Sequence, residues 1–124
     1  RQSLCYYCSS RFDMQKGILY VDSGVEGDNL EKAEKAILKE IADMQSGNIS
    51  DFEIDATKMA VINSFNSTND TVSGIDSWYT SQLFNGSFKT IDELSAEINA
   101  VTKEQLVDAA KKLRLDTVFV LKNK

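Results

Sequence analysis

The sequence predicts an α+β fold in which helices pack on one face of a mostly antiparallel sheet. Two observations predict this fold. Apolar and polar residues alternate over residues 3–12 and again over 18–23, which is the two-residue period of β-strands. From residue 29 onward the apolar residues recur at helical spacing, until a β-branched segment at 117–121 predicts a last strand.

The first predicted element is a β-hairpin. Residues 13–17 form a polar loop that ends in glycine, between the two alternating segments. Alternation also divides the first strand into two faces. One face holds Leu4, Tyr6, Cys8, Ser10 and Phe12, and the other holds Cys5, Tyr7, Ser9 and Arg11.

Residues 29–46 carry the clearest helical pattern. We expect Asp28 or Asn29 to cap the N-terminus of this helix, and Gly47 to end it. The acidic Glu31 falls in the first turn, where the helix dipole favours a negative charge. The apolar stripe consists of Leu30, Ala33, Ile37, Leu38, Ile41 and Met44.

Three capping boxes predict where the later helices begin. They run from Ser50 to Glu53, from Thr90 to Glu93 and from Thr102 to Gln105. The polar tract at 66–71 is poor helix material, so the helix that follows the first box is expected to bend or break near 66–74. Asn85 and Gly86 predict a loop before the second box.

Length and strand content predict the domain organisation. The 124 residues suffice for one domain with a modest core, so residues 1–124 are predicted to form a single domain. Three strands would make only a thin sheet, and we therefore expect at least one further strand upstream of residue 1.

Composition argues against two classes of partner. The formal net charge is −5, whereas nucleic-acid binding depends on Lys and Arg that neutralise phosphates. No apolar run approaches the roughly 20 residues that a membrane-spanning helix needs. We therefore predict a cytoplasmic protein that binds neither nucleic acid nor membrane.

The chain has no histidine, which removes the usual general base and the commonest zinc ligand. Cys5 and Cys8 form a C-x-x-C motif, but no second pair of ligands exists to complete a structural zinc site. A redox pair would sit at a helix N-terminus, whereas these two residues lie in a predicted strand and point to opposite faces. We interpret them as small apolar strand residues and predict no metal site and no cofactor in this chain.

Two further sets of residues each allow two interpretations. Acidic residues in predicted first helical turns either complement the helix dipole, which we favour, or form a catalytic carboxylate pair. These residues are Asp51, Glu53, Asp55, Asp92, Glu93 and Glu97. Tyr6, Tyr7 and Arg11 cluster at the front of the hairpin, where a tyrosine can either pack with its hydroxyl at the rim or bind a ligand.

The segment Ser3-Leu-Cys-Tyr-Tyr-Cys-Ser-Ser-Arg-Phe-Asp13, with Lys16-Gly-Ile-Leu-Tyr-Val21, resembles the second-domain motif of the pitrilysin/insulinase family of zinc metallopeptidases. A leucine, a small residue and a tyrosine on a strand precede a hairpin and a long helix in that motif. The ending also resembles the family, with a Thr-capped helix from Val101 to Ala110 before the last predicted strand. The front segment most resembles a bacterial, inactive zinc-peptidase-like subgroup.

This resemblance implies a specific role for the chain. The family's modules form a chamber around an extended peptide, and zinc is held in the first module by H-x-x-E-H. A chain without histidine would be the C-terminal part of a later, non-catalytic module, with zinc only in a partner module. The resemblance implies that Tyr6 binds substrate together with an arginine seven residues earlier, and that the two help to stabilise the oxyanion formed when zinc-activated water attacks the peptide carbonyl. That arginine would precede residue 1, because Arg1 is only five residues before Tyr6.

Three functions remain open at the level of sequence. The resemblance favours a fragment of a peptidase that lines the peptide-binding chamber, with Tyr6 as the substrate-binding residue and no catalytic residue. The first alternative is a structural or scaffold subunit that pairs with a zinc-bearing partner. The second is an unrelated α+β domain that interacts with peptides.

Overall fold

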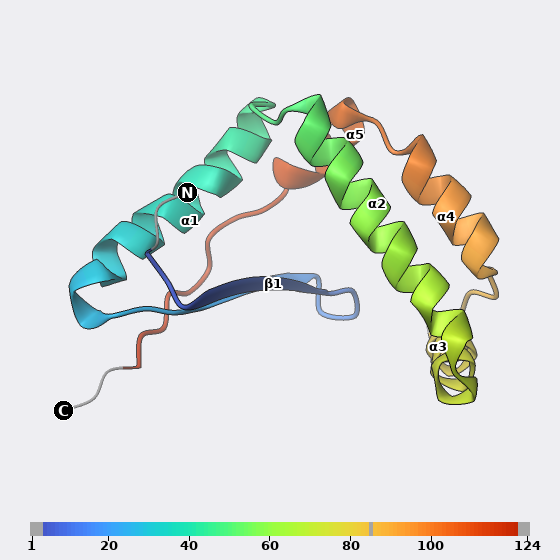
Figure 1. The fold of residues 1–124 in the computed structure, drawn as a ribbon. Coiled ribbons are helices and arrows are strands. Elements are labelled where there is room, and N and C mark those ends of the chain that lie inside the picture. The colour runs from blue at the N-terminus through green and yellow to red at the C-terminus, as the bar shows by residue number, and fades with distance from the viewer. Residues whose placement is uncertain (1–3, 85, 122–124) are drawn as a thin grey trace. The chain divides into compact units, whose positions relative to one another are not determined.

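The computed structural model describes residues 4–84 and 86–121, and it confirms the predicted α+β class. Figure 1 shows a two-stranded hairpin followed by helices. Within the described residues the strands are β1 (Tyr7–Asp13) and β2 (Ile18–Gly24). The helices are η1 (Gly27–Asn29), α1 (Leu30–Ser46), α2 (Asp51–Ser67), η2 (Thr68–Asp70), α3 (Val72–Phe84), α4 (Ile91–Ala100) and α5 (Lys103–Ala110).

The chain divides into two compact units. The first, called the hairpin unit here, contains the residues up to Asn48 and those from Val107 onward. The second, called the helical unit, is Ile49–Leu106. The organisation of residues 1–124 as a single domain stays a prediction.

The hairpin has the predicted antiparallel pairing. Its register runs from Tyr7 opposite Gly24 to Asp13 opposite Ile18. The first strand begins at Tyr7, so the prediction that it begins at residue 3 is wrong for the described residues Leu4 to Tyr6. A residue needs an opposite backbone to join the ladder, and β2 ends at Gly24, opposite Tyr7.

The loop between the strands closes as the sequence predicts. The Oδ1 atom of Asp13 accepts hydrogen bonds from the backbone N–H groups of Gln15 and Lys16, both at 3.0 Å. The Gly17 N–H then donates to the Asp13 carbonyl at 2.8 Å. Gly17 has φ +66°, a left-handed conformation that glycine adopts without a steric penalty.

Helix α1 matches the predicted helix in its length and its C-terminus. Gly47 has φ +77°, and the chain closes the helix with hydrogen bonds from Gly47 N–H to Met44 O and from Asn48 N–H to Asp43 O. The predicted side-chain cap is wrong, because neither Asp28 nor Asn29 caps α1 with its side chain. Asn29 already has helical dihedral angles after the 3₁₀ turn, whereas a capping residue is normally extended.

The end of the hairpin unit differs from the prediction. Residues 117–121 were predicted to form a strand, but they form no regular element in the structure (Figure 1). A β-strand needs a neighbouring strand for its backbone hydrogen bonds, and within the described residues the sheet consists of β1 and β2 only. Phe119 and Leu121 are accordingly 83% and 88% exposed.

The helical unit confirms the predicted helix starts and the predicted break. Capping boxes at Ser50 and Thr90 begin α2 and α4, and Thr102 exchanges the equivalent pair of hydrogen bonds with Gln105. The long helix breaks at η2, between α2 and α3. Of the predicted Asn85–Gly86 loop, Asn85 lies outside the described residues and Gly86 has φ +65°.

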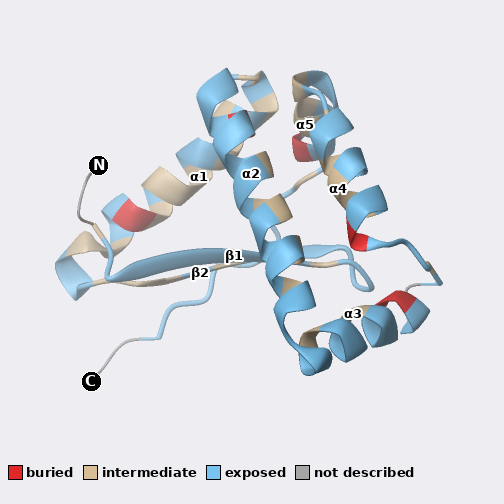
Figure 2. Cartoon of the chain, turned by 45° about the vertical axis from the view of Figure 1, so that its right-hand side comes forward, coloured by how far each residue is buried: buried red, intermediate tan, exposed pale blue. Residues whose placement is uncertain are grey.

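Packing within the helical unit joins α2 to α4, which lie side by side in Figures 1 and 2. Ile54 on α2 and Ile91 on α4 are its buried apolar residues. Lys58 on α2 donates a 2.9 Å hydrogen bond to the Asn99 carbonyl at the end of α4. The Phe65 ring makes an edge-to-face contact with Trp78 of α3, with ring centroids 5.2 Å apart.

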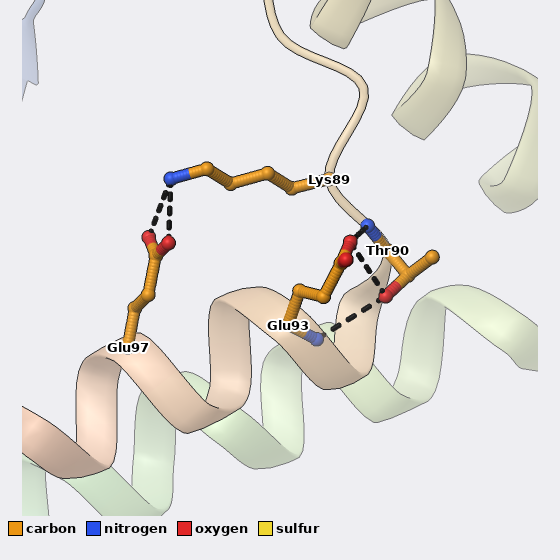
Figure 3. A network of polar contacts seen from close by, with 4 residues as sticks. All are labelled: Lys89, Thr90, Glu93 and Glu97. Atoms are coloured by element: carbon orange, nitrogen blue, oxygen red, sulfur yellow. Dashed lines mark hydrogen bonds and ion pairs between the residues drawn. The ribbon is translucent and has the colours of Figure 1, made fainter.

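Two of the six acidic residues, Glu53 and Glu93, complete capping boxes at the starts of α2 and α4. At the start of α4 the Glu93 carboxylate accepts from the Thr90 N–H at 2.8 Å, while the Thr90 hydroxyl accepts from the Glu93 N–H (Figure 3). Lys89 donates to both carboxylate oxygens of Glu97, at 2.6 and 2.7 Å. Hydrogen bonding to Thr90, first its backbone and then its side chain, lowers the pKa of Glu93.

Candidate functional site at the open end of the hairpin

Tyr6 lies immediately before β1, at the open end of the hairpin. Its backbone N–H donates to the Gly24 carbonyl at 2.8 Å, so the chain is already fixed to the end of β2 at this point. The side chain is 75% exposed. A fixed backbone therefore presents an aromatic ring and a phenol to the surroundings, which are groups that can contact a peptide.

The Tyr6 phenol is held by a carboxylate. Its hydroxyl donates a 2.7 Å hydrogen bond to Oε1 of Glu26. Glu26 is extended, with ψ 148°, and follows β2 directly before η1. This hydrogen bond and the negative charge of Glu26 raise the pKa of Tyr6, because both disfavour the phenolate.

The neighbouring Tyr7 points to the other side of the hairpin and lies against Gly24. A Cβ atom on Gly24 would come within 2.5 Å of Cε1 of the Tyr7 ring, so only glycine leaves room for the ring in this position. The Ser23 hydroxyl donates to the Tyr7 carbonyl at 2.8 Å. These contacts fix the strand end from which Tyr6 projects.

Farther along the same face as Tyr7, two side-chain pairs cross the strands. Ser9 donates to Oδ1 of Asp22 at 2.9 Å. The guanidinium of Arg11 lies over the Tyr20 ring, 5.6 Å from its centroid. The structure therefore brings Tyr6 and Tyr7 to the open end, but it places Arg11 with Tyr20 instead, where the guanidinium makes a cation–π contact.

Glu26 was not among the site residues predicted from the sequence. The hairpin register indicates where a partner of Tyr6 must come from. Tyr7 lies opposite Gly24 in the antiparallel pair, so the residues just after Gly24 must lie beside Tyr6. Only the three-dimensional path of the chain into η1 shows that the partner is Glu26 and not one of its neighbours. Arg1, the residue weighed as a partner of Tyr6, lies outside the described residues.

The other candidate groups are the cysteines and clusters of possible metal ligands. Cys5 and Cys8 are exposed, free thiols. Among residues 4–84 and 86–121, no group of three or more His, Cys, Asp or Glu side chains is placed to hold a metal ion. In that same part of the chain, no helix combines the length and apolar composition needed to cross a membrane.

The helical unit contains one further surface feature, a shallow open hollow of about 460 Å³ along α2. Its wall is formed by Ala56, Thr57, Ala60, Val61, Ser64 and Phe65. These residues contribute two hydroxyls and no charged group, so the hollow lacks the convergent polar groups typical of a small-molecule site.

Comparison with known proteins relates this geometry to a family. The family described as "Peptidase M16 inactive domain" matches residues 1–61, a segment that includes the hairpin and Tyr6. A protein named "Probable inactive metalloprotease YmfF" from Bacillus subtilis (strain 168) is 35% identical over 122 residues. The match covers 98% of this chain and 29% of that protein.

A solved structure is also similar to most of the chain. The crystal structure of a conserved protein from Enterococcus faecalis V583 superposes with a TM-score of 0.77 at 29% sequence identity. The match covers 90% of this chain and 26% of the Enterococcus faecalis chain. The chain thus spans less than a third of the length of each of these two relatives. Residues 1–61 thus match the inactive domain of the peptidase M16 family, and the chain as a whole is similar to a probable inactive metalloprotease, in agreement with the resemblance of its first segment to the pitrilysin/insulinase family.

Proposed function

We propose that this chain forms part of the peptide-binding wall of a larger, pitrilysin-like protein, and that Tyr6 contacts the bound peptide. The observation that carries the proposal is the placement of Tyr6: its backbone is fixed to Gly24 at 2.8 Å while its side chain stays 75% exposed. A group that is positioned by the backbone and left open is suited to contact a ligand without reorganising first.

The role of the chain is to bind and to orient. An extended peptide can pair with the backbone at a sheet edge, while side chains beside that edge select its residues. The chain supplies no histidine, so any zinc chemistry belongs to another module or to a zinc-bearing partner subunit. We propose a peptide substrate, partner modules of the M16 type and a cytoplasmic location for the whole protein.

A second candidate is a scaffold subunit that assembles with a zinc-bearing partner and does not touch the peptide. The name of the Bacillus subtilis relative, "Probable inactive metalloprotease", favours it. On this alternative, changes at Tyr6 would leave peptide binding unaltered. The two candidates therefore differ in one measurable property.

The test is Tyr6→Phe in the full-length protein, with binding of a fluorescein-labelled unstructured peptide followed by fluorescence anisotropy. Loss of one hydrogen-bonding hydroxyl should weaken binding about fivefold, which corresponds to about 1 kcal/mol. If the assembled protein cleaves peptides, turnover at subsaturating peptide concentrations should also fall, because less peptide is bound.

Tyr20→Phe is the matched control. Tyr20 lies on the same hairpin, and phenylalanine preserves the ring that the Arg11 guanidinium covers. Its loss of a hydroxyl should leave peptide binding unchanged. Equal binding by Tyr6→Phe, Tyr20→Phe and the unsubstituted protein would contradict the peptide-contact role and favour the scaffold.

A further inference from the structure

The direction of the Tyr6 hydrogen bond limits what this residue offers to a ligand. A phenol has one proton and two acceptor lone pairs. The Tyr6 proton is donated to the Glu26 carboxylate, at 2.7 Å. The outward side of the hydroxyl therefore presents an acceptor, and the adjoining group is a carboxylate, which only accepts.

The surroundings add to this acceptor character. Residues 20–28 contain three acidic residues and no lysine or arginine. The arginine of the hairpin, Arg11, contacts Tyr20 and is thus turned to another aromatic ring. Lys16 lies in the loop at the opposite end of the hairpin from Tyr6. Among the described residues, the two cations of the hairpin, Arg11 and Lys16, therefore lie away from the Tyr6–Glu26 pair.

We infer that the Tyr6–Glu26 pair binds a cationic N–H group of the peptide, either a Lys or Arg side chain or a free amino terminus. The inference rests on the proposed peptide-binding function and names its substrate class. Glu26 is a specificity-determining residue: its carboxylate binds the cation and also turns the Tyr6 lone pairs toward it. A charge-assisted hydrogen bond to the carboxylate is the stronger of the two contacts.

This assignment differs from a role as donor to a developing oxyanion. To donate to an anion, the Tyr6 hydroxyl would have to leave Glu26, and the anion would then lie beside an unpaired carboxylate. Repulsion between the two negative charges disfavours that arrangement. The raised pKa of Tyr6 agrees with this view, since its first cause is the hydrogen bond that the phenol donates to Glu26.

The experiment measures charge preference in the full-length protein. The probes are fluorescein-labelled, N-acetylated peptides that differ only at a central Lys, Gln or Glu, and a fourth peptide that has the Gln sequence with a free amino terminus. At low salt the Lys peptide should bind about threefold more tightly than the Gln peptide, the size expected for an exposed ion pair. This preference should decline as salt is added. The fourth peptide distinguishes a side-chain cation from an amino terminus.

Glu26→Gln should abolish the preference, because the amide keeps an acceptor oxygen but lacks the charge. Glu31→Gln is the matched control, since Glu31 is an exposed acidic residue in the first turn of α1 whose nearest ion-pair partner is Lys35 at 3.9 Å. It should keep the threefold preference. Glu26→Gln should also lower the phenol pKa of Tyr6, read by NMR of labelled tyrosine, because the negative charge that raises this pKa is removed.

The outcomes separate this inference from the function on which it rests. Binding that depends on Tyr6 but ignores peptide charge, in both Glu26→Gln and the unsubstituted protein, would overturn the cation site and leave the peptide-binding role intact. Tightest binding of the Glu peptide would also overturn it. Binding that is indifferent to Tyr6→Phe would overturn the proposed function itself.

Discussion

The hairpin is stabilised by one set of interactions, and the helical unit by another. In β1 every residue except Asp13 is exposed, and the strand is fixed by its ladder with β2 and by cross-strand pairs such as Ser9 with Asp22. The helical unit instead combines buried Ile54 and Ile91 with reciprocal capping bonds. The hairpin contacts leave side chains exposed, which suits a surface that binds a ligand. The buried and capped helices suit a supporting structure.

The hairpin and the helical unit should also differ in stability. A two-stranded hairpin is marginal by itself, because it buries little apolar surface. Helix caps and packed helices contribute more to the free energy of unfolding than the contacts of a lone hairpin do. We therefore expect changes in the helical unit to shift unfolding strongly while hydrogen exchange in the hairpin changes little. Trp78, the only tryptophan, lies in α3, so its fluorescence reports on the helical unit.

The largest expected effect is that of Gly74→Ala, at the start of α3. A Cβ atom at this position would lie 2.5 Å from the backbone carbonyl oxygen of Thr68 and 2.9 Å from Oγ1 of Thr71. The first contact is with backbone, so the joint between η2 and α3 must shift. Such overpacking should lower the free energy of unfolding by about 2 kcal/mol, measured by urea denaturation followed with Trp78 fluorescence.

Gly27→Ala is the control for this substitution. The added Cβ at Gly27 meets no atom within 4 Å, and its position in η1 belongs to the hairpin unit. Its unfolding midpoint should match that of the unsubstituted protein. Equal stability of Gly74→Ala and Gly27→Ala would show that the joint between α2 and α3 yields freely.

The second prediction concerns the cap of α4. Thr90→Ala removes the hydroxyl that accepts the Glu93 N–H at 3.2 Å, which leaves an orphan donor at the helix start. The free energy of unfolding should fall by about 1 kcal/mol. Thr90→Ser keeps the hydroxyl and should recover most of that loss. Equal losses for the two variants would mean that the methyl group, not the cap, stabilises this helix.

The caps also show which parts of the fold are predictable from sequence. A capping box spans four residues, so the starts at Ser50, Thr90 and Thr102 follow from local chemistry. The break before α3 follows likewise from a polar tract. Residues 117–121 have strand propensity, but pairing depends on a distant neighbour that propensity cannot supply. For the candidate site, Tyr6 followed from the resemblance, whereas its partner Glu26 depended on the path of the chain after β2.

The smallest expected effect is a pH dependence of the helical unit. Hydrogen bonds from Thr90 lower the pKa of Glu93 in the folded state, so its ionised form binds the helix start more tightly than the protonated form does. The stabilisation is complete above the pKa of glutamate in the unfolded chain, about 4.3, and is lost as the pH falls through the lower folded value. Glu93→Gln keeps a side chain that can complete the box but cannot titrate.

Unfolding of Glu93→Gln should therefore depend less on pH between about pH 5 and pH 3 than unfolding of the unsubstituted protein. Thermal denaturation followed by Trp78 fluorescence at a series of pH values measures the difference. Glu40→Gln, an exposed change in α1 outside any capping box, should keep the full dependence. If both variants retained the same acid sensitivity, the carboxylate at the α4 cap would contribute no charge-dependent stability. The contrast between the helical unit and the hairpin would then rest on packing alone.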